Sequence, residues 1–100
     1  MIKRTRRPTH PGELLREEFL PNTGMSRAEL ARLMSISRQT VGDLLLERRS
    51  VTPDIAIRLS RVFPMQTPTF WLRLQAEVDV WDAQRAKATE YERIKPARVA

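Results

Sequence analysis

The chain contains no cysteine among its 100 residues. A disulfide framework and thiolate chemistry are therefore excluded, which fits a reducing cytoplasm. No apolar run approaches the roughly 18 residues that a membrane-spanning helix needs. The basic N-terminal segment also lacks the apolar stretch of a secretory signal. These absences predict a cytoplasmic protein with no membrane partner.

Groups that commonly carry catalysis are also scarce. His10 is the only histidine, and its place at the start of an expected helix favours a capping or surface role. The three glycines form no phosphate-binding loop, and no spacing of histidine and cysteine suits a metal ion. No serine has a histidine placed to complete a catalytic triad. The acidic residues, Asp79 and Asp82 included, lie among arginines as ordinary solvated groups. We therefore predict neither enzyme activity nor a metal ion or cofactor.

Positive charge is concentrated at the N-terminus. The net charge is +6, of which four residues supply +4: Lys3, Arg4, Arg6 and Arg7. The rest of the chain is close to neutral. Residues 1–9 therefore form a basic arm, which can reach phosphates or a minor groove when it lies beside a DNA-binding unit. The alternative is a disordered segment that only aids solubility.

Apolar residues recur at helical spacing in five segments. The segments span residues 11–20, 26–34, 37–45, 52–63 and 67–83, of which the last is the longest. Proline at position 11, and the Thr-Pro pairs at 52–53 and 67–68, suit helix starts. The Phe63-Pro64 pair ends the fourth segment, because a residue before proline avoids helical geometry.

No strand pattern, internal repeat or low-complexity tract interrupts these segments. The sequence therefore predicts an all-α fold of five helices with a long C-terminal helix. We expect one DNA-binding and dimerisation domain at residues 10–85. The charged end that follows, residues 86–100, has no clear apolar pattern and is expected to fray.

Residues 26–49 have the pattern of a helix-turn-helix. Ser26 begins a capping box with Glu29, and Ser37 is a second candidate cap after a short break. Two short helices joined in this way can cross at the steep angle that the motif needs. Ala31 suits the crossing because a small side chain lets the helices approach closely, and Ile36 would fill the corner between them.

The second of these helices carries polar residues on its exposed side. Arg38 and Gln39 lie in its first turn, and recognition helices contact base edges mainly through their N-terminal residues. Arginine pairs with guanine and glutamine with adenine, while Asp43 could accept from cytosine or orient a neighbouring arginine. Gly42 would allow close approach to the duplex. The alternative is a solvated helix face with no partner.

Large aromatic residues mark the last helix. Trp71, Val78 and Trp81 recur at spacings of three and four. Such a stripe is commonly part of the core, but four other helices already supply one, and exposed apolar patches mark interfaces. We therefore predict a homodimer interface around these three residues. A dimer would place two recognition helices about 34 Å apart, as a palindromic site requires.

Three landmarks resemble the HigA-type antitoxins, a branch of the Xre helix-turn-helix repressors. They are HPGELLREEFL at residues 10–20, the helix-turn-helix at 26–49, and TPDIAIRLSRVF followed by TPTFWLRLQAEVDVWDA at 52–83. The FWLRLQ element is the most specific, because generic Xre domains lack it. The resemblance covers about residues 8–85 and implies a λ-repressor-like, all-α dimer.

The resemblance also implies a function and a set of site residues. Such proteins bind palindromic operator DNA, repress their own operon, and neutralise a small basic RelE-like ribonuclease toxin (HigB) that cuts mRNA. The family's base-reading positions fall on Arg38, Gln39 and Asp43. Its phosphate-contacting positions fall on five residues: Arg27, Ser37, Thr40, Arg48 and Arg49.

The sequence departs from the family pattern in three places. Ser35 occupies a turn position that is often glycine. Residues 46–49, Leu-Glu-Arg-Arg, replace a common turn that resembles Asn-Gly-Lys, which would place the charge of Glu47 near phosphates. Val78-Asp79-Val80 replaces a common Tyr-Asp-Leu, a change that affects packing rather than function.

A toxin surface is harder to place. A basic toxin would be attracted to the acidic residues Glu13, Glu17 and Glu18 of the first helix. The alternative is a solvated face whose acids favour the helix N-terminus. Two other functions also fit: a stand-alone repressor without a toxin, and a protein-binding module whose motif no longer contacts DNA.

Overall fold

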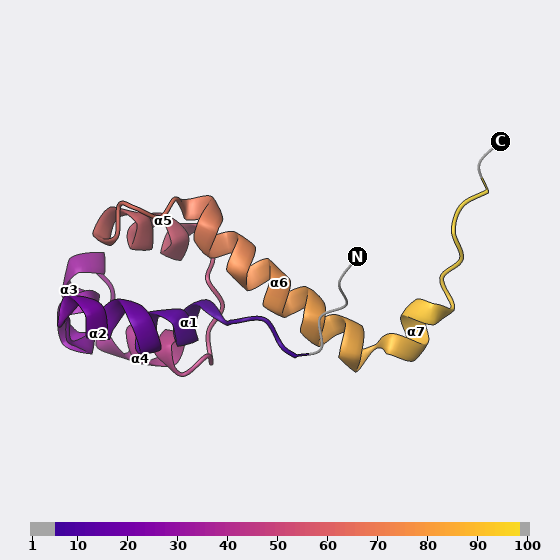
Figure 1. Ribbon diagram of the computed structural model, residues 1–100, viewed down its shortest axis with the longest axis horizontal. Coiled ribbons are helices and arrows are strands. Elements are labelled where there is room, and N and C mark those ends of the chain that lie inside the picture. Colours follow the sequence, from indigo (N-terminus) through magenta and orange to yellow (C-terminus); the bar gives the residue numbers. More distant parts are fainter. Residues whose placement is uncertain (1–5, 99–100) are drawn as a thin grey trace.

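The computed structural model describes residues 6–98, and the predicted all-α fold is confirmed, since these residues contain no strand. The first helix is continuous and consists of α1 (Pro11–Leu14), η1 (Leu15–Phe19), a wider π-helical turn, and α2 (Leu20–Thr23). It is followed by α3 (Arg27–Met34), α4 (Arg38–Leu45), α5 (Pro53–Val62) and α6 (Pro68–Ala86) (Figure 1). A short helix that the sequence did not predict, α7 (Ala88–Glu92), lies within the charged end.

Each of the five predicted helices begins with a side-chain cap. The caps are His10 on the N–H of Gly12 (2.9 Å), Ser26 on Glu29 (3.1 Å), Ser37 on Thr40 (3.0 Å), Thr52 on Ile55 (3.3 Å) and Thr67 on Phe70 (3.2 Å). Each cap satisfies an N–H group that has no partner within its helix. Of the two roles predicted for His10, the capping role is therefore confirmed, whereas the surface role is wrong because its side chain is buried.

Helices α2 and α3 each end in a left-handed residue. Gly24 closes α2 with φ 67°, a conformation that glycine adopts without a steric penalty. Ser35 closes α3 with φ 57°, at the position where the sequence has serine in place of the common glycine. The side chain of Arg58 in α5 donates to the carbonyl oxygens of Met34 (2.8 Å) and Ser35 (3.3 Å), so α5 fixes the C-terminal end of α3.

The core is centred on aromatic rings from three parts of the chain. The ring centroid of Phe19 lies 4.9 Å from that of Phe63 and 5.1 Å from that of Trp71, and Phe70 lies 5.1 Å from Trp71. These rings meet edge to face, a favourable arrangement. Trp71 is fully buried, so the beginning of α6 belongs to the core.

The molecule is elongated, with extents of 54 × 25 × 25 Å. Helices α1 to α5 and the start of α6 form a compact body, and the far end of α6 extends away from it with α7 (Figure 1). None of the helices in residues 6–98 is long and apolar enough to cross a bilayer.

The first helix lies very close to α4. A Cβ atom on Gly12 would collide with the carbonyl oxygen of Leu44. Any larger residue at this position would push the first helix away from the end of α4. This close contact between the first helix and α4 therefore explains why the first turn of the helix contains a buried glycine.

Gln75 joins α6 to the segment after α4. Its Oε1 accepts a hydrogen bond from the N–H of Val51 (2.9 Å), and its Nε2 donates to Asp79 (2.9 Å). Both Gln75 and Val51 are buried. The amide therefore satisfies a backbone group that would otherwise be buried without a partner.

Candidate nucleic-acid interface

The predicted helix-turn-helix is formed by α3, the turn at residues 35–37, and α4. Ala31 is 2 % exposed, as a close helix crossing requires. Ile36 is half-buried against the core, and its N–H donates to the carbonyl oxygen of Ala31 (3.1 Å). The short turn therefore brings the start of α4 to the surface while the rest of the helix packs inward.

The residues predicted to read bases differ in exposure. Arg38 and Gln39 are exposed in the first turn of α4, and Asp43 is half-buried one turn further along. Arg38 forms no ion pair within residues 6–98. Its guanidinium group is therefore available to a partner of opposite charge or to a base edge.

Ser37 and Thr40 form a hydroxyl pair at the start of α4. Ser37 Oγ accepts from the N–H of Thr40, and the two hydroxyl groups share a hydrogen bond of 2.8 Å in which either is the donor. One hydroxyl hydrogen of the pair therefore remains free. A free donor at a helix N-terminus is suited to a phosphate oxygen.

Gly42 lies beneath Arg27 of α3. It is buried, and a Cβ atom there would lie 3.4 Å from Nη1 and 3.9 Å from Cδ of Arg27, which is ordinary van der Waals contact. The position therefore has room for a small side chain, and close approach to the duplex at Gly42 stays a prediction. Arg27 is otherwise exposed and lies across α4.

The loop after α4 presents two basic residues. Arg48 and Arg49 are exposed, as phosphate contact requires. Glu47 does not add free negative charge beside them, because its carboxylate pairs with Arg7 (3.1 Å) and Arg16 (3.5 Å). Arg16 also donates to the carbonyl oxygen of Leu45.

One residue of the basic arm is bound to the folded body. The Nε and Nη2 atoms of Arg7 each donate to a carboxylate oxygen of Asp82 in α6, at 2.9 Å. The hydrogen bond from Arg7 lowers the pKa of Asp82. Arg6 is exposed, and Lys3 and Arg4 of the predicted arm lie outside the described residues.

The predicted dimer surface requires a correction. Trp71 is 0 % exposed and Val78 is 1 % exposed within a single chain, so neither offers a surface to a partner. Trp81 is half-buried, with the guanidinium group of Arg85 4.6 Å from its ring centroid. Of the three residues, only Trp81 stays available for contact between chains.

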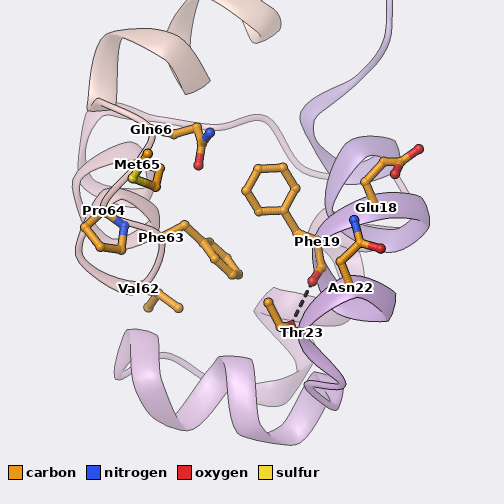
Figure 2. A pocket seen from close by; sticks show the side chains of 9 residues that line it. All are labelled: Glu18, Phe19, Asn22, Thr23, Val62, Phe63, Pro64, Met65 and Gln66. Carbon is orange, nitrogen blue, oxygen red and sulfur yellow. Dashed lines mark hydrogen bonds between the residues drawn. The ribbon is translucent and has the colours of Figure 1, made fainter.

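One of the three acidic residues of the first helix, Glu18, lines a pocket. Glu13, Glu17 and Glu18 are exposed. The pocket has a volume of about 370 Å³ and lies between the first helix and the α5–α6 connection. Figure 2 shows Phe19 of the first helix and Phe63 pointing toward each other in this pocket, with Met65 on the α5–α6 side. Met65 is 89 % exposed.

Sequence reasoning missed several residues that organise this surface. Arg16, Glu47 and Gln75 make long-range contacts that no local pattern predicts. Two of them had a weak signal: Glu47 interrupts a turn that is commonly glycine, and Gln75 belongs to the FWLRLQ element. The departure from the family pattern at Glu47 thus marked a residue that forms long-range ion pairs.

The helix-turn-helix family HTH_3 matches residues 15–70. The Vibrio cholerae protein named antitoxin HigA-1 is 37 % identical over 100 residues, which is 100 % of this chain and 93 % of that protein.

Two solved structures are similar over most of their length. The Pseudomonas aeruginosa antitoxin HigA, solved with the higBA promoter, has a TM-score of 0.86 and 41 % identity and covers 92 % of this chain and 100 % of its own. The antitoxin GraA in complex with its operator has a TM-score of 0.85 and 41 % identity, with 100 % of both chains covered.

Proposed function

The chain belongs to the helix-turn-helix family, and we propose that it is the antitoxin of a type II toxin–antitoxin module in the bacterial cytoplasm. In this role it is a dimeric, sequence-specific repressor of its own operon, and it also binds and neutralises a RelE-like (HigB) ribonuclease. The observation that carries the proposal is the likeness, over the whole chain, to an antitoxin solved with its operator.

Base readout is assigned to the exposed side of α4. Arg38 donates to O6 and N7 of a guanine, and Gln39 pairs with N6 and N7 of an adenine. Asp43 accepts from a cytosine amino group or orients Arg38 or Arg27. The exposure of Arg38 and Gln39 in the first turn supports this assignment.

Phosphate contacts are assigned to residues on both sides of the recognition surface. Arg27 lies across α4, the Ser37–Thr40 pair has a free hydroxyl hydrogen, and Arg48 and Arg49 extend from the loop. These contacts fix the position of the protein on the duplex and do not depend on the base sequence of the DNA.

Dimerisation is assigned to the far end of α6, around Trp81. This segment extends beyond the compact body, so a second copy can pack on it without covering α4 (Figure 1). Two copies would read a palindrome whose half-sites are one helical turn, about 34 Å, apart. Repression follows because the bound dimer blocks access of the polymerase to the promoter.

Toxin binding is assigned to the face with Glu13, Glu17 and Glu18. Acidic groups attract a basic protein and raise its rate of association. The pocket beside Glu18 adds an apolar site, and protein interfaces commonly combine a buried apolar anchor with a charged rim. The alternative is a stand-alone repressor with no toxin partner, which the same DNA-reading residues would serve.

A mobility shift with the chain's own upstream DNA tests the repressor. Wild-type protein should shift this DNA at physiological salt in the presence of scrambled competitor. Gln39→Ala should weaken binding by about 1–3 kcal/mol and relax the preference at one operator position. An equal loss on all sequences would contradict base reading by Gln39.

A pull-down separates the antitoxin from the stand-alone repressor. The probe is a purified RelE-like (HigB) ribonuclease, and the test variant is Glu18→Lys. Wild-type protein should retain the probe and prevent it from cutting mRNA, and Glu18→Lys should retain less. Specific DNA binding without retention by the wild type would favour the stand-alone repressor.

A further inference from the structure

We propose that Arg7, Glu47 and Asp82 form a clamp that positions the Arg48–Arg49 loop for contact with DNA phosphates. The clamp joins the root of the basic arm, the end of the recognition helix and α6. The inference rests on the proposed DNA binding, and it assigns to two acidic residues a role that favours binding to a polyanion.

The first observation is the backbone of Glu47. Its φ is 62°, and the N–H of Arg48 donates to the carbonyl oxygen of Asp43 (2.8 Å), so α4 ends in a motif that commonly has glycine at this position. A side chain there has a steric cost that glycine avoids. A glutamate at a glycine position therefore needs a compensating interaction.

The second observation is the pair of ion pairs that supplies this compensating interaction. Glu47 binds Arg7 through Oε1 (3.1 Å) and Arg16 through Oε2 (3.5 Å), and only 25 % of its side chain is exposed. Arg16 also reaches the carbonyl oxygen of Leu45. The end of α4 is thereby held by the first helix and by the arm at the same time.

The third observation is the anchor on α6. Arg7 binds Asp82 with two N–H groups at 2.9 Å each, which is the fork geometry of a strong arginine–carboxylate pair. The third contact of Arg7 is with Glu47. Arg7 therefore bridges α6 and the loop, and a change at either carboxylate loosens the same guanidinium group.

The clamp leaves the basic residues of the loop free. Neither Arg48 nor Arg49 forms an ion pair in the part of the chain that the structure describes, and both are exposed. The loop is thus held by other residues, and its two guanidinium groups do not have to be released before they bind phosphate. Such preorganisation favours affinity because fewer side chains and less backbone must be ordered on binding.

The sign of the effect distinguishes the clamp from simple electrostatics. If Glu47 and Asp82 were bystanders, removing either negative charge would strengthen binding to DNA. If they position the loop, removing either will weaken binding although the protein becomes more positive.

The test measures operator affinity at 50 to 200 mM salt for the wild type, Glu47→Gln and Asp82→Asn. Each substitution removes one negative charge and keeps the size of the side chain, so the ion pairs of the clamp are lost without a change in the steric cost at position 47. Thermal melting checks the fold. We expect about three- to tenfold weaker binding and a salt slope reduced by about one, as loss of one phosphate contact predicts. The matched control is Glu90→Gln in exposed α7, which removes one acidic charge away from the clamp and should bind at least as well as wild type.

The double variant adds a second criterion. Because both carboxylates act through Arg7, its loss of affinity should be smaller than the product of the two single losses. The clamp would be overturned if the single variants bind the operator as well as the wild type or better. It would also be overturned if the loss in the double variant equals the product of the two single losses. Absence of specific binding by the wild type would instead contradict the proposed repressor, which separates the two failures.

Discussion

The two halves of α6 belong to one uninterrupted helix but have different surroundings. In the first half Trp71, Gln75 and Val78 are buried in the compact body. In the second half Val80 is 54 % exposed and Trp81 is only half-buried. The same spacing of apolar residues therefore serves the core in one half and leaves a surface in the other.

The difference shows why a periodic stripe does not identify an interface. Spacing predicts which residues share a helix face, but not whether another part of the chain covers that face. Here the first helix and α5 cover the beginning of α6 with Phe19 and Phe63. The far end extends past them (Figure 1). The exposed half is consequently the part of α6 that can meet another chain.

The largest expected contrast is between the two tryptophans. Trp71→Ala should lower the free energy of unfolding by about 3–5 kcal/mol, because it leaves a cavity within the aromatic core. Trp81→Ala should cost the single chain about 1 kcal/mol or less. Urea unfolding followed by circular dichroism measures both values.

Size-exclusion chromatography at several concentrations sharpens this contrast. Trp81→Ala should shift the protein toward monomer, and its effect on the unfolding midpoint should depend on concentration, because dimerisation stabilises the folded state. An unchanged dimer would exclude Trp81 from the interface. Equal destabilisation by the two substitutions would contradict the division of α6 into two halves.

A smaller contrast separates Gln75 from Gln84. Gln75→Ala should cost about 1–3 kcal/mol, since the buried N–H of Val51 loses its acceptor. Gln84 is exposed in the far half of the same helix, so Gln84→Ala should change stability by about 0.5 kcal/mol or less. The comparison uses the same pair of residue types and the same chemical unfolding measurement. Similar costs at both positions would show that the amide of Gln75 does not hold α6 to the body.

The helix starts and the helix-turn-helix could be predicted from sequence because they depend on neighbouring residues. Ser26 and Ser37 cap their helices through N–H groups three residues away. The bond between Arg7 and Asp82 joins residues 75 positions apart, and exposed charges carry no signal of their partner. The contact of Gly42 with Arg27 could not be predicted either, since a residue without a side chain fits either face of an amphipathic helix.

The next prediction concerns how the stability of the compact body depends on pH through His10. Burial lowers the pKa of His10 below its ordinary value of 6.5, while the charge of Glu47 opposes the shift. Well above pH 6.5 the imidazole is neutral in both the folded and the unfolded state. As pH falls below 6.5, the unfolded chain takes up a proton that the folded chain resists, so stability should decrease.

His10→Asn tests this origin. Asparagine can cap the helix but does not titrate, so the variant should lose part of the dependence of stability on pH between 7 and 5. Thermal unfolding across this range measures the slope for both proteins. An identical slope would assign the pH dependence to other groups.

The smallest expected effect comes from the end of the chain. Residues 88–98 contain no buried residue, and α7 lies beside the far end of α6 (Figure 1). A chain that ends at Lys87 should therefore unfold within about 0.5 kcal/mol of the full chain when both are monomeric. Helix α7 and the residues after it would then add little to the fold of the single chain. If the shortened chain loses stability only at concentrations where the full chain is dimeric, Tyr91 and Ile94, which are 41 % and 71 % exposed, belong to the interface. A loss at all concentrations would mean instead that α7 stabilises the body through α6, and the two halves of that helix would have to be treated as one structural unit.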